Sequence, residues 1–128
     1  MSVEYAYDYA VIRVVPRVDR GEQINVGVIL SCPDTDFLDA RIELDEPRLL
    51  ALDSSVDLSA IRSNLDAIPV VCRGGPDAGP IGSLPPRGRF RWLVSPRSTV
   101  VQPGAVHTGR THDPAACLEH LMDRMVRR

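Results

Sequence analysis

A short segment near residue 90 combines guanidinium groups with aromatic rings, two side-chain types that proteins use to hold nucleic acids. The segment runs Arg87-Gly-Arg-Phe-Arg-Trp92. Arginine can bind phosphate, and Phe or Trp can stack on bases. Read as a strand, the segment places its aromatic rings inward and its arginines outward, so a core strand with a solvated face explains the same pattern. The nucleic-acid candidates are Arg87, Arg89 and Arg91.

A second group of arginines lies in the polar stretch after residue 16. Arg17 and Arg20 occur there with Glu22 and Asn25. Paired arginines near a glycine can hold an anion or the carboxylate of a partner. Arg97 follows a break in the chain and could meet the same anion, provided that it lies on the same face. The alternative is an internal ion-pair network, for instance between Arg13 or Arg20 and Glu22.

The histidines and cysteines do not form a recognisable catalytic or metal-binding motif. His107 and His112 are five residues apart in a glycine-containing loop, and Cys117 and His120 are three apart on an expected helix. A zinc site needs further ligands at matching geometry, and the sequence offers none. Cys117 lacks assignable partners for nucleophilic catalysis. We therefore assign no catalytic residue and expect neither a metal nor a cofactor.

All side-chain cations other than histidine are arginines, because the 128-residue chain contains no lysine. This excludes a P-loop lysine, a Schiff base and a kinase-type strand lysine. A GC-rich genome would produce the same depletion without any mechanistic reason. Residues 1–77 carry 14 acidic and 7 basic side chains, whereas residues 78–128 carry 3 and 8. The net charge of -2 therefore conceals an electropositive C-terminal segment.

The length favours a single domain over residues 1–128 with a core of its own. The three cysteines are widely spaced, and the acidic, aromatic start does not resemble a signal peptide. No stretch approaches the roughly 20 apolar residues that a membrane-spanning helix needs. We expect a reduced, cytoplasmic protein.

The N-terminal part predicts three consecutive strands, over residues 5–15, 24–31 and 38–44, because apolar and polar residues alternate there. In the first strand, Arg13 falls on an otherwise apolar face, where it needs a partner if that face is buried. The first connection is too long for a two-residue hairpin and can present side chains. The order predicts an antiparallel meander.

Helical spacing follows the third strand. Asp45 is the expected N-cap of a helix to about residue 52, and Asp57 of a longer helix that Pro69 should kink or end. Residues 74–88 are rich in Gly and Pro and predict a loop or hinge. Two strands, over 90–94 and 98–102, precede a helix capped by Asp113. Its expected inward-facing residues are Ala115, Leu118, Leu121, Met122 and Met125.

This order of elements predicts an α+β fold. An antiparallel sheet of about five strands would pack with two to three helices in a two-layer sandwich.

Several separated motifs lie along the chain: 7–16 (YDYAVIRVVP), 20–29 (RGEQINVGVI), 79–84 (GPIGSL), 89–93 (RFRWL), 96–99 (PRST), 107–109 (HTG) and 113–114 (DP). They resemble a bacterial family, the domain of unknown function 3037, and the likeness covers nearly the whole chain. The family has no established activity, but its genes often neighbour those of HipA-like kinases, which implies a small accessory or regulatory subunit. The positions carried over from the resemblance, without assigned roles, are Arg13, Arg17, Arg20, Glu22, Asn25, Gly27, Arg97, Ser98 and His107. All of them except Gly27 are the ligand- or anion-binding candidates.

We expect a non-enzymatic accessory or regulatory protein that binds a partner protein through complementary charged patches. A HipA-like kinase, in a toxin-antitoxin-like pair, is the candidate partner. The alternative is a nucleotide- or RNA-binding module that uses Arg97 and the arginines of 87–91, with an affinity that falls steeply with salt. The least favoured alternative is an enzyme with a site around His107, Arg97 and Glu22. An exposed strand edge would permit a homo-oligomer, and no membrane partner is expected.

Overall fold

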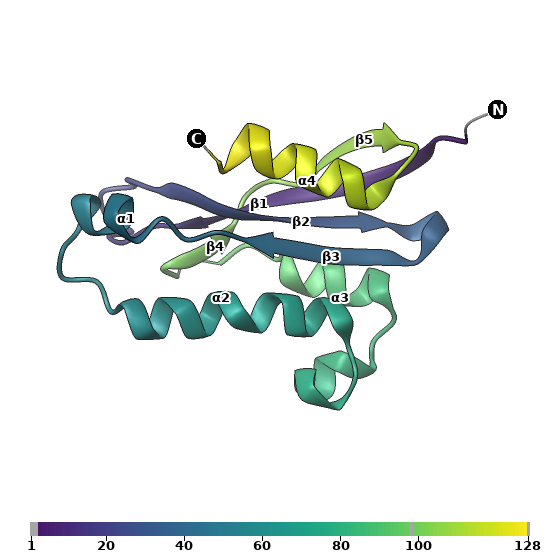
Figure 1. Ribbon diagram of the computed structural model, residues 1–128. Helices are drawn as coiled ribbons and strands as arrows, with labels where there is room; N and C mark the ends of the chain where they lie inside the picture. Colours follow the sequence, from purple (N-terminus) through teal and green to yellow (C-terminus); the bar gives the residue numbers. More distant parts are fainter. Residues whose placement is uncertain (1–2, 98, 128) are drawn as a thin grey trace.

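The computed structural model describes residues 3–97 and 99–127, and its centre is a five-stranded antiparallel sheet (Figure 1). The strand order is β3-β2-β1-β4, and β5 pairs with β1 beside β4. This confirms the α+β class and the antiparallel meander of the first three strands. The strands are β1 (Tyr5–Val14), β2 (Ile24–Cys32), β3 (Phe37–Ile42), β4 (Val101–Pro103) and β5 (His107–Thr111).

Three of the α-helices begin at the aspartates expected from the sequence. The side chains of Asp45, Asp57 and Asp113 each accept a hydrogen bond from the backbone N–H three residues later, at 3.2, 3.0 and 3.2 Å. The helices are α1 (Glu46–Leu52), α2 (Leu58–Arg73), α3 (Pro86–Leu93) and α4 (Pro114–Met125), with short 3-10 segments η1 (Pro33–Thr35) and η2 (Pro76–Ser83). No helix in the described ranges is long and apolar enough to cross a membrane.

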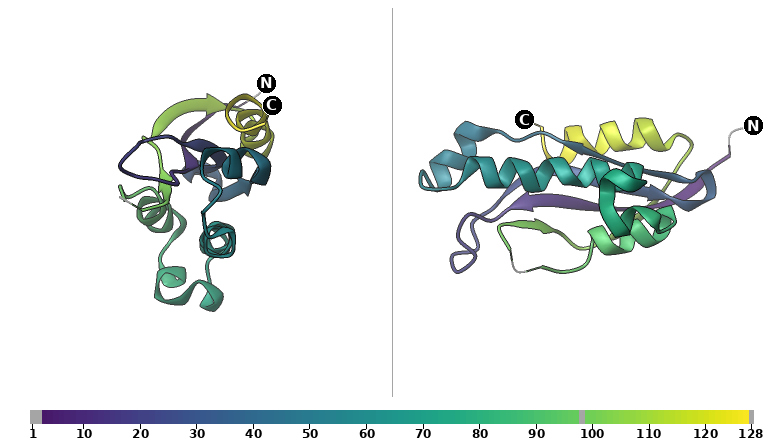
Figure 2. Two further views of the ribbon diagram at one scale, coloured as in Figure 1. Left: turned by 90° about the vertical axis from the view of Figure 1, so that its left-hand side faces the viewer. Right: turned by 90° about the horizontal axis from the view of Figure 1, so that it is seen from below.

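The helices cover both faces of the sheet, which adds a third layer to the expected two (Figure 2). One core lies between the sheet and α2 and α3, and includes Ile12, Ile29 and Phe90. A second core lies under α4, where Leu118 and Met122 are buried as expected. Ala115, in contrast, is exposed because it lies in the first turn of α4, away from the sheet.

β2 contributes apolar side chains to both cores, and a β-bulge changes which of its residues face each core. Ile12 pairs with Gly27 and Arg13 pairs with Asn25, which leaves Val26 as an extra residue. Ile24 and Val26 lie in the core under α2 and α3. After the bulge, Val28 and Leu30 lie in the core under α4, and Ile29 on the opposite face lies in the first core. The apolar residues of the expected alternation therefore do not stay on one face.

The expected strand over residues 90–94 is wrong, because these residues belong to α3 and the turn that follows it. The tandem prolines before the segment place Pro86 in the first helical turn, where a missing N–H costs nothing. Helical spacing buries Phe90 and also Arg89, and it leaves Trp92 exposed. The expected division into inward aromatics and outward arginines is therefore also wrong.

Two neighbouring predictions need smaller corrections. The strand expected over 98–102 is Val101–Pro103, and residue 98 lies outside the described ranges. The histidine-containing loop expected around residue 107 instead begins with β5, which pairs with the first half of β1.

α2 does not end at Pro69 but continues for a further turn, and the buried Arg89 of α3 stabilises that turn. The Arg89 guanidinium donates to the carbonyl oxygens of Val71, at 2.9 Å, and Cys72, while Nε donates to the carbonyl of Leu84 at 3.0 Å. The helix ends at Gly74, which has a φ of +74°. A Cβ there would lie 2.8 Å from Arg89 Cζ, so only glycine leaves room for the guanidinium.

The buried thiol of Cys72 predicts a loss of stability at alkaline pH. Burial raises its pKa to about 12 from an ordinary value of 9.0. Above pH 9 the unfolded chain releases the thiol proton and the folded chain keeps it, so the free energy of unfolding should fall between about pH 9 and 12. Urea denaturation of wild type and Cys72→Val at pH 8 to 11 measures this.

Because the chain contains no lysine, deprotonation of side-chain amines does not contribute to the pH dependence of stability in this interval. Burial and the nearby Cys117 also raise the pKa of Tyr7 to about 12, which adds a loss of the same sign above about pH 10. The Cys72→Val variant should therefore show a shallower decline than wild type. Equal slopes would mean that Cys72 ionises equally well in both states.

Candidate functional site

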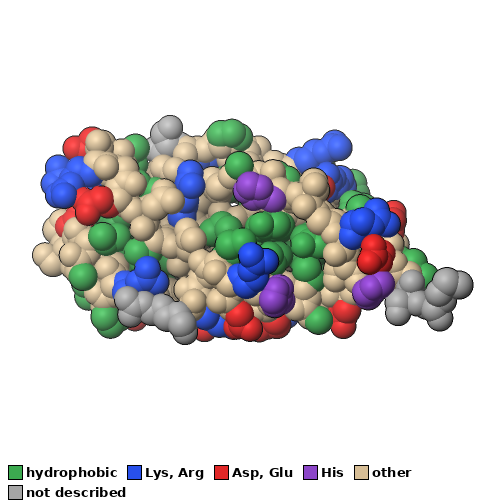
Figure 3. Space-filling model, turned by 90° about the horizontal axis from the view of Figure 1, so that it is seen from above, with side chains coloured by type: hydrophobic (Ala, Val, Ile, Leu, Met, Phe, Trp, Pro, Cys, Tyr) green, Lys and Arg blue, Asp and Glu red, His purple; other side chains and the backbone are tan. Residues whose placement is uncertain are grey.

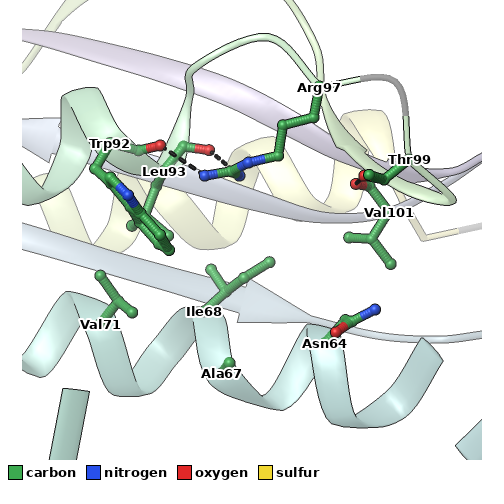
Figure 4. A pocket seen from close by; sticks show the side chains of 9 residues that line it. All are labelled: Asn64, Ala67, Ile68, Val71, Trp92, Leu93, Arg97, Thr99 and Val101. Atoms are coloured by element: carbon green, nitrogen blue, oxygen red, sulfur yellow. Dashed lines mark hydrogen bonds between the residues drawn. The ribbon is translucent and has the colours of Figure 1, made fainter. Parts of the chain in front are cut away.

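An apolar groove of about 290 Å³ lies between α2 and the chain that leads from α3 to β4 (Figure 4). α2 forms one wall, and Trp92 of α3 forms the opposite wall together with the segment that follows it. The indole of Trp92 faces the side chains of Ile68 and Val71 across the groove. The lining residues are Asn64, Ala67, Ile68, Val71, Trp92, Leu93, Arg97, Thr99 and Val101.

Arg97 fixes the position of Trp92 at the rim of this groove. Its guanidinium lies over the indole, with Cζ 4.8 Å from the ring centroid. Nη1 and Nη2 donate to the backbone carbonyls of Leu93 and Trp92, at 3.1 and 2.8 Å. The cation thus donates to two carbonyls at the C-terminus of α3, of which that of Trp92 also accepts from the Ser95 N–H at 3.4 Å, and it interacts favourably with the helix dipole.

The described lining of this groove suits the binding of an apolar group. Within the parts of the chain that the structure describes, it includes no carboxylate, histidine or cysteine. Trp92 remains 43 % exposed despite its size. The apolar walls suit an apolar side chain, and the uncompensated charge of Arg97 suits an acceptor group at the rim.

Two of the three nucleic-acid candidates are engaged in contacts within the protein. Arg87 donates to Asp8 at 2.6 Å and to the Ser31 hydroxyl at 3.2 Å, and it also lies over the Phe90 ring. Arg89 is buried, with the carbonyl partners given above. Only Arg91 is exposed. The row of outward-facing arginines that a strand would have produced does not form.

Arg17 and Arg20 line a polar depression of about 460 Å³ beside residues 50–55, which form the end of α1 and the start of its connection to α2. Each forms a local ion pair, Arg17 with Asp19 at 3.5 Å and Arg20 with Glu22 at 2.7 Å. The ion pair expected as the alternative to anion binding is therefore present. Arg97 lines the groove beside Trp92 instead, so the three arginines do not converge on one anion.

Asn25 and His107, two further candidates, both lie on the side of the sheet that carries α4. Asn25 donates to the carbonyl of Met125, at 2.9 Å, and so holds the end of α4. His107 is exposed on β5 and stacks on Tyr9, with 5.4 Å between the ring centroids. Apolar side chains gather in the middle of this face, with arginine and histidine at their border (Figure 3).

His107 does not join Arg97 and Glu22 in one site. His107 pairs with the first half of β1, whereas Glu22 lies in the loop beyond the end of that strand. The described residues also contain no group of three or more His, Cys, Asp or Glu side chains that could hold a metal ion. Ser98, another candidate, lies outside the described ranges.

A family model described as "Protein of unknown function (DUF3037)" matches residues 9–126, from the middle of β1 to the residue that follows α4. The chain belongs to the DUF3037 family. This confirms the resemblance drawn from the separated motifs, and the family match includes both walls of the Trp92 groove. No curated protein and no solved structure matches the chain. Membership of DUF3037 therefore supplies no activity, and the function has to be inferred from the residues themselves.

Proposed function

We propose that the protein is an accessory or regulatory subunit that binds a partner protein through the groove beside Trp92. An apolar side chain of the partner enters the groove, and a carboxylate next to it pairs with Arg97. The observation that carries this proposal is the exposed indole, which Arg97 holds in place over an apolar floor.

The geometry matches the features that concentrate binding energy at protein interfaces. Tryptophan and arginine are the side chains most enriched at interface positions whose truncation is costly. Arg97 already restrains the indole, so binding would immobilise little additional side-chain freedom. The groove volume of about 290 Å³ is small for a drug-sized ligand, and it suits a single side chain better.

The charge around the groove favours an acidic partner segment. Arg91 is exposed on the same helix as Trp92, and Arg97 forms no ion pair with the described carboxylates. Residues 78–128 carry the excess of basic side chains. The family resemblance makes a HipA-like kinase the first partner to test. The nucleic-acid alternative is less favoured because Arg87 and Arg89 already have internal partners.

Co-expression with a HipA-like kinase, followed by an affinity measurement on the purified pair, tests the proposal. Trp92→Ala should weaken binding by about thirtyfold or more, the loss typical of a central interface tryptophan. Leu50→Ala is the matched control, because Leu50 is also apolar and is 37 % exposed, but lies on α1. Arg97→Gln should weaken binding and reduce its salt dependence.

The outcomes separate the alternatives. Equal affinity of wild type and Trp92→Ala for the kinase would contradict the groove as the binding site. Failure of the kinase to associate at low salt would exclude it as the partner. Nucleic acid in the eluate, with an affinity that falls steeply with salt and is insensitive to Trp92→Ala, would favour the nucleic-acid module.

A further inference from the structure

Arg13 is a cation without a counter-charge among the described residues. Its Nε is buried and has no hydrogen-bond partner. None of the ion pairs that the described residues form involves Arg13. The side chain projects from β1, opposite Gln102 of β4. The sequence flagged this position as one that needs a partner, and the fold supplies none.

A pocket of about 390 Å³ lies against Arg13, separate from the Trp92 groove. The remaining lining is almost wholly apolar and comes from the end of α3, from Pro96 and from the β4–β5 connection, which includes Gly104 and Val106. The short segment after α3 separates the two cavities. Leu93 and Arg97 line the Trp92 groove, whereas Val94 and Pro96 line this pocket.

Arg13 is partly exposed, and its charge has no counter-charge among the described carboxylates. The buried Nε–H has lost the hydration it had in the unfolded chain and gains no hydrogen bond in return. The side chain lines a pocket whose other walls are mainly apolar, and there its attraction to an anion is stronger than in bulk water. Arg13 is thus costly to the isolated fold and well suited to an anionic ligand.

We infer that Arg13 binds the carboxylate of a ligand whose short apolar body fills this pocket. A guanidinium edge matches the planar fork of a carboxylate, which can accept two parallel hydrogen bonds, and a carboxylate on a short apolar chain suits the apolar walls of this pocket. Because solvent does not reach Nε, the carboxylate pairs with the Nη atoms, and it compensates the charge of the guanidinium while the Nε–H stays unpaired. Val94, Pro96 and Val106 contact the apolar body of the ligand, and Val106 is 43 % exposed without it.

Gly104 keeps space open beside the cation. Its N–H donates to the carbonyl of Val11 at 2.7 Å, which fixes the β4–β5 connection against β1. A Cβ at this position would lie 3.7 Å from Arg13 Nη1. A side chain built from Gly104 would therefore project next to the guanidinium, in the region that the ligand carboxylate occupies.

Nuclear magnetic resonance of the full chain labelled with 15N tests this inference with three probes: butyrate, an N-acetylated tripeptide ending in valine with a free carboxylate, and the same tripeptide as its amide. A carboxylate probe should shift the Arg13 Nε–H signal and the amides of Gly104 and Val106 in a saturable way, and the amide should not. If butyrate binds and the acid tripeptide does not, the ligand is a free small carboxylate. If the acid tripeptide binds and butyrate does not, the ligand is the C-terminus of a polypeptide. Absence of a saturable shift with both carboxylates would overturn the inference.

Two substitutions make the test specific. Arg13→Met should abolish the shifts, whereas Arg91→Met, which removes an exposed arginine, should leave them unchanged. Arg13→Met should also melt at the same or a higher temperature than wild type, because it removes a buried unsatisfied donor. A decrease of several degrees would show instead that Arg13 stabilises the fold, and would contradict its assignment to a ligand.

If Arg13→Met fails to fold, Gly104→Asp tests the same site, because its carboxylate competes with the ligand for Arg13. The new carboxylate should pair with Arg13, prevent butyrate binding and raise the melting temperature, and Gly104→Asn is the uncharged control. Unchanged butyrate binding in Gly104→Asp would overturn the inference. Trp92→Ala should bind the carboxylate probes like wild type, so failure of the partner-binding proposal and failure of this one are distinguishable.

Discussion

Replacement of Arg89 by methionine is expected to lower the free energy of unfolding by about 3 kcal/mol or more. The side chain is only 8 % exposed, and its guanidinium donates to three backbone carbonyls, of which two belong to the last turn of α2. Methionine retains much of the apolar packing but removes the guanidinium from all three carbonyls. Val71 keeps the Gly74 N–H as a donor, at 3.1 Å, whereas the carbonyls of Cys72 and Leu84 lose the side-chain donor, at about 1–3 kcal/mol for each buried group that stays unpaired. The turn of α2 beyond Pro69 should fray as a result.

Arg91→Met is the matched control for this substitution, because Arg91 lies two residues away on the same helix and is exposed. Its effect on stability should stay within about 0.5 kcal/mol. Urea denaturation measures both variants, and amide hydrogen exchange shows whether the loss in Arg89→Met concentrates in α2 and α3. Equal stabilities for the two variants would mean that Arg89 does not hold α2 to α3.

Replacement of Phe90 by alanine should cost about 3–5 kcal/mol, the range for truncation of a buried aromatic ring. Phe90 is 2 % exposed and packs in the core between α2, α3 and the sheet. Its ring also lies under the Arg87 guanidinium, at 5.1 Å, and that cation pairs with Asp8 of β1. The truncation therefore removes a core contact and loosens a polar connection between α3 and the sheet.

Trp92→Ala is the informative comparison, because it removes a larger ring from the same helix. Trp92 is mostly supported by Arg97 and the groove rim, so its loss should cost about 1 kcal/mol or less. Thermal denaturation of the two variants decides between the helix and the strand. A strand with both rings facing inward would make the two losses similar, whereas the helix makes the Phe90→Ala loss several times larger.

The strands and helix starts that were predicted correctly depend on local signals. β1 to β3 follow from alternation over six or more residues, and the N-caps of α1, α2 and α4 follow from an aspartate before a helical pattern. α3 has only eight residues, and four of them, from Arg89 to Trp92, alternate as in a strand. The pair Phe90 and Leu93, three residues apart after Pro85 and Pro86, was the signal for a helix.

The site was less predictable because its walls come from distant parts of the chain. Arg97 was a candidate from the sequence, but its role depends on Trp92 and on α2, which only the tertiary structure brings alongside. From the sequence, Arg87 and Arg89 were candidates for binding phosphate. In the helix that forms instead of a strand, Arg87 pairs with Asp8 and Arg89 donates to the end of α2. Arg13 was placed on an apolar face from its position in β1, and the structure shows that no described carboxylate accompanies it there.

The way in which β4 and β5 share one edge of β1 has a consequence for self-association. β5 covers residues 5–9 of β1 and β4 covers residues 12–14, so the outer border of the sheet is interrupted by the turn between them. The opposite border, β3, is six residues long and carries Asp39 and Arg41, which pair with each other, while Arg41 also reaches Glu119 of α4. Neither border offers another chain a long, flat, uncharged template for adding a strand, and this arrangement protects the sheet from edge-to-edge aggregation.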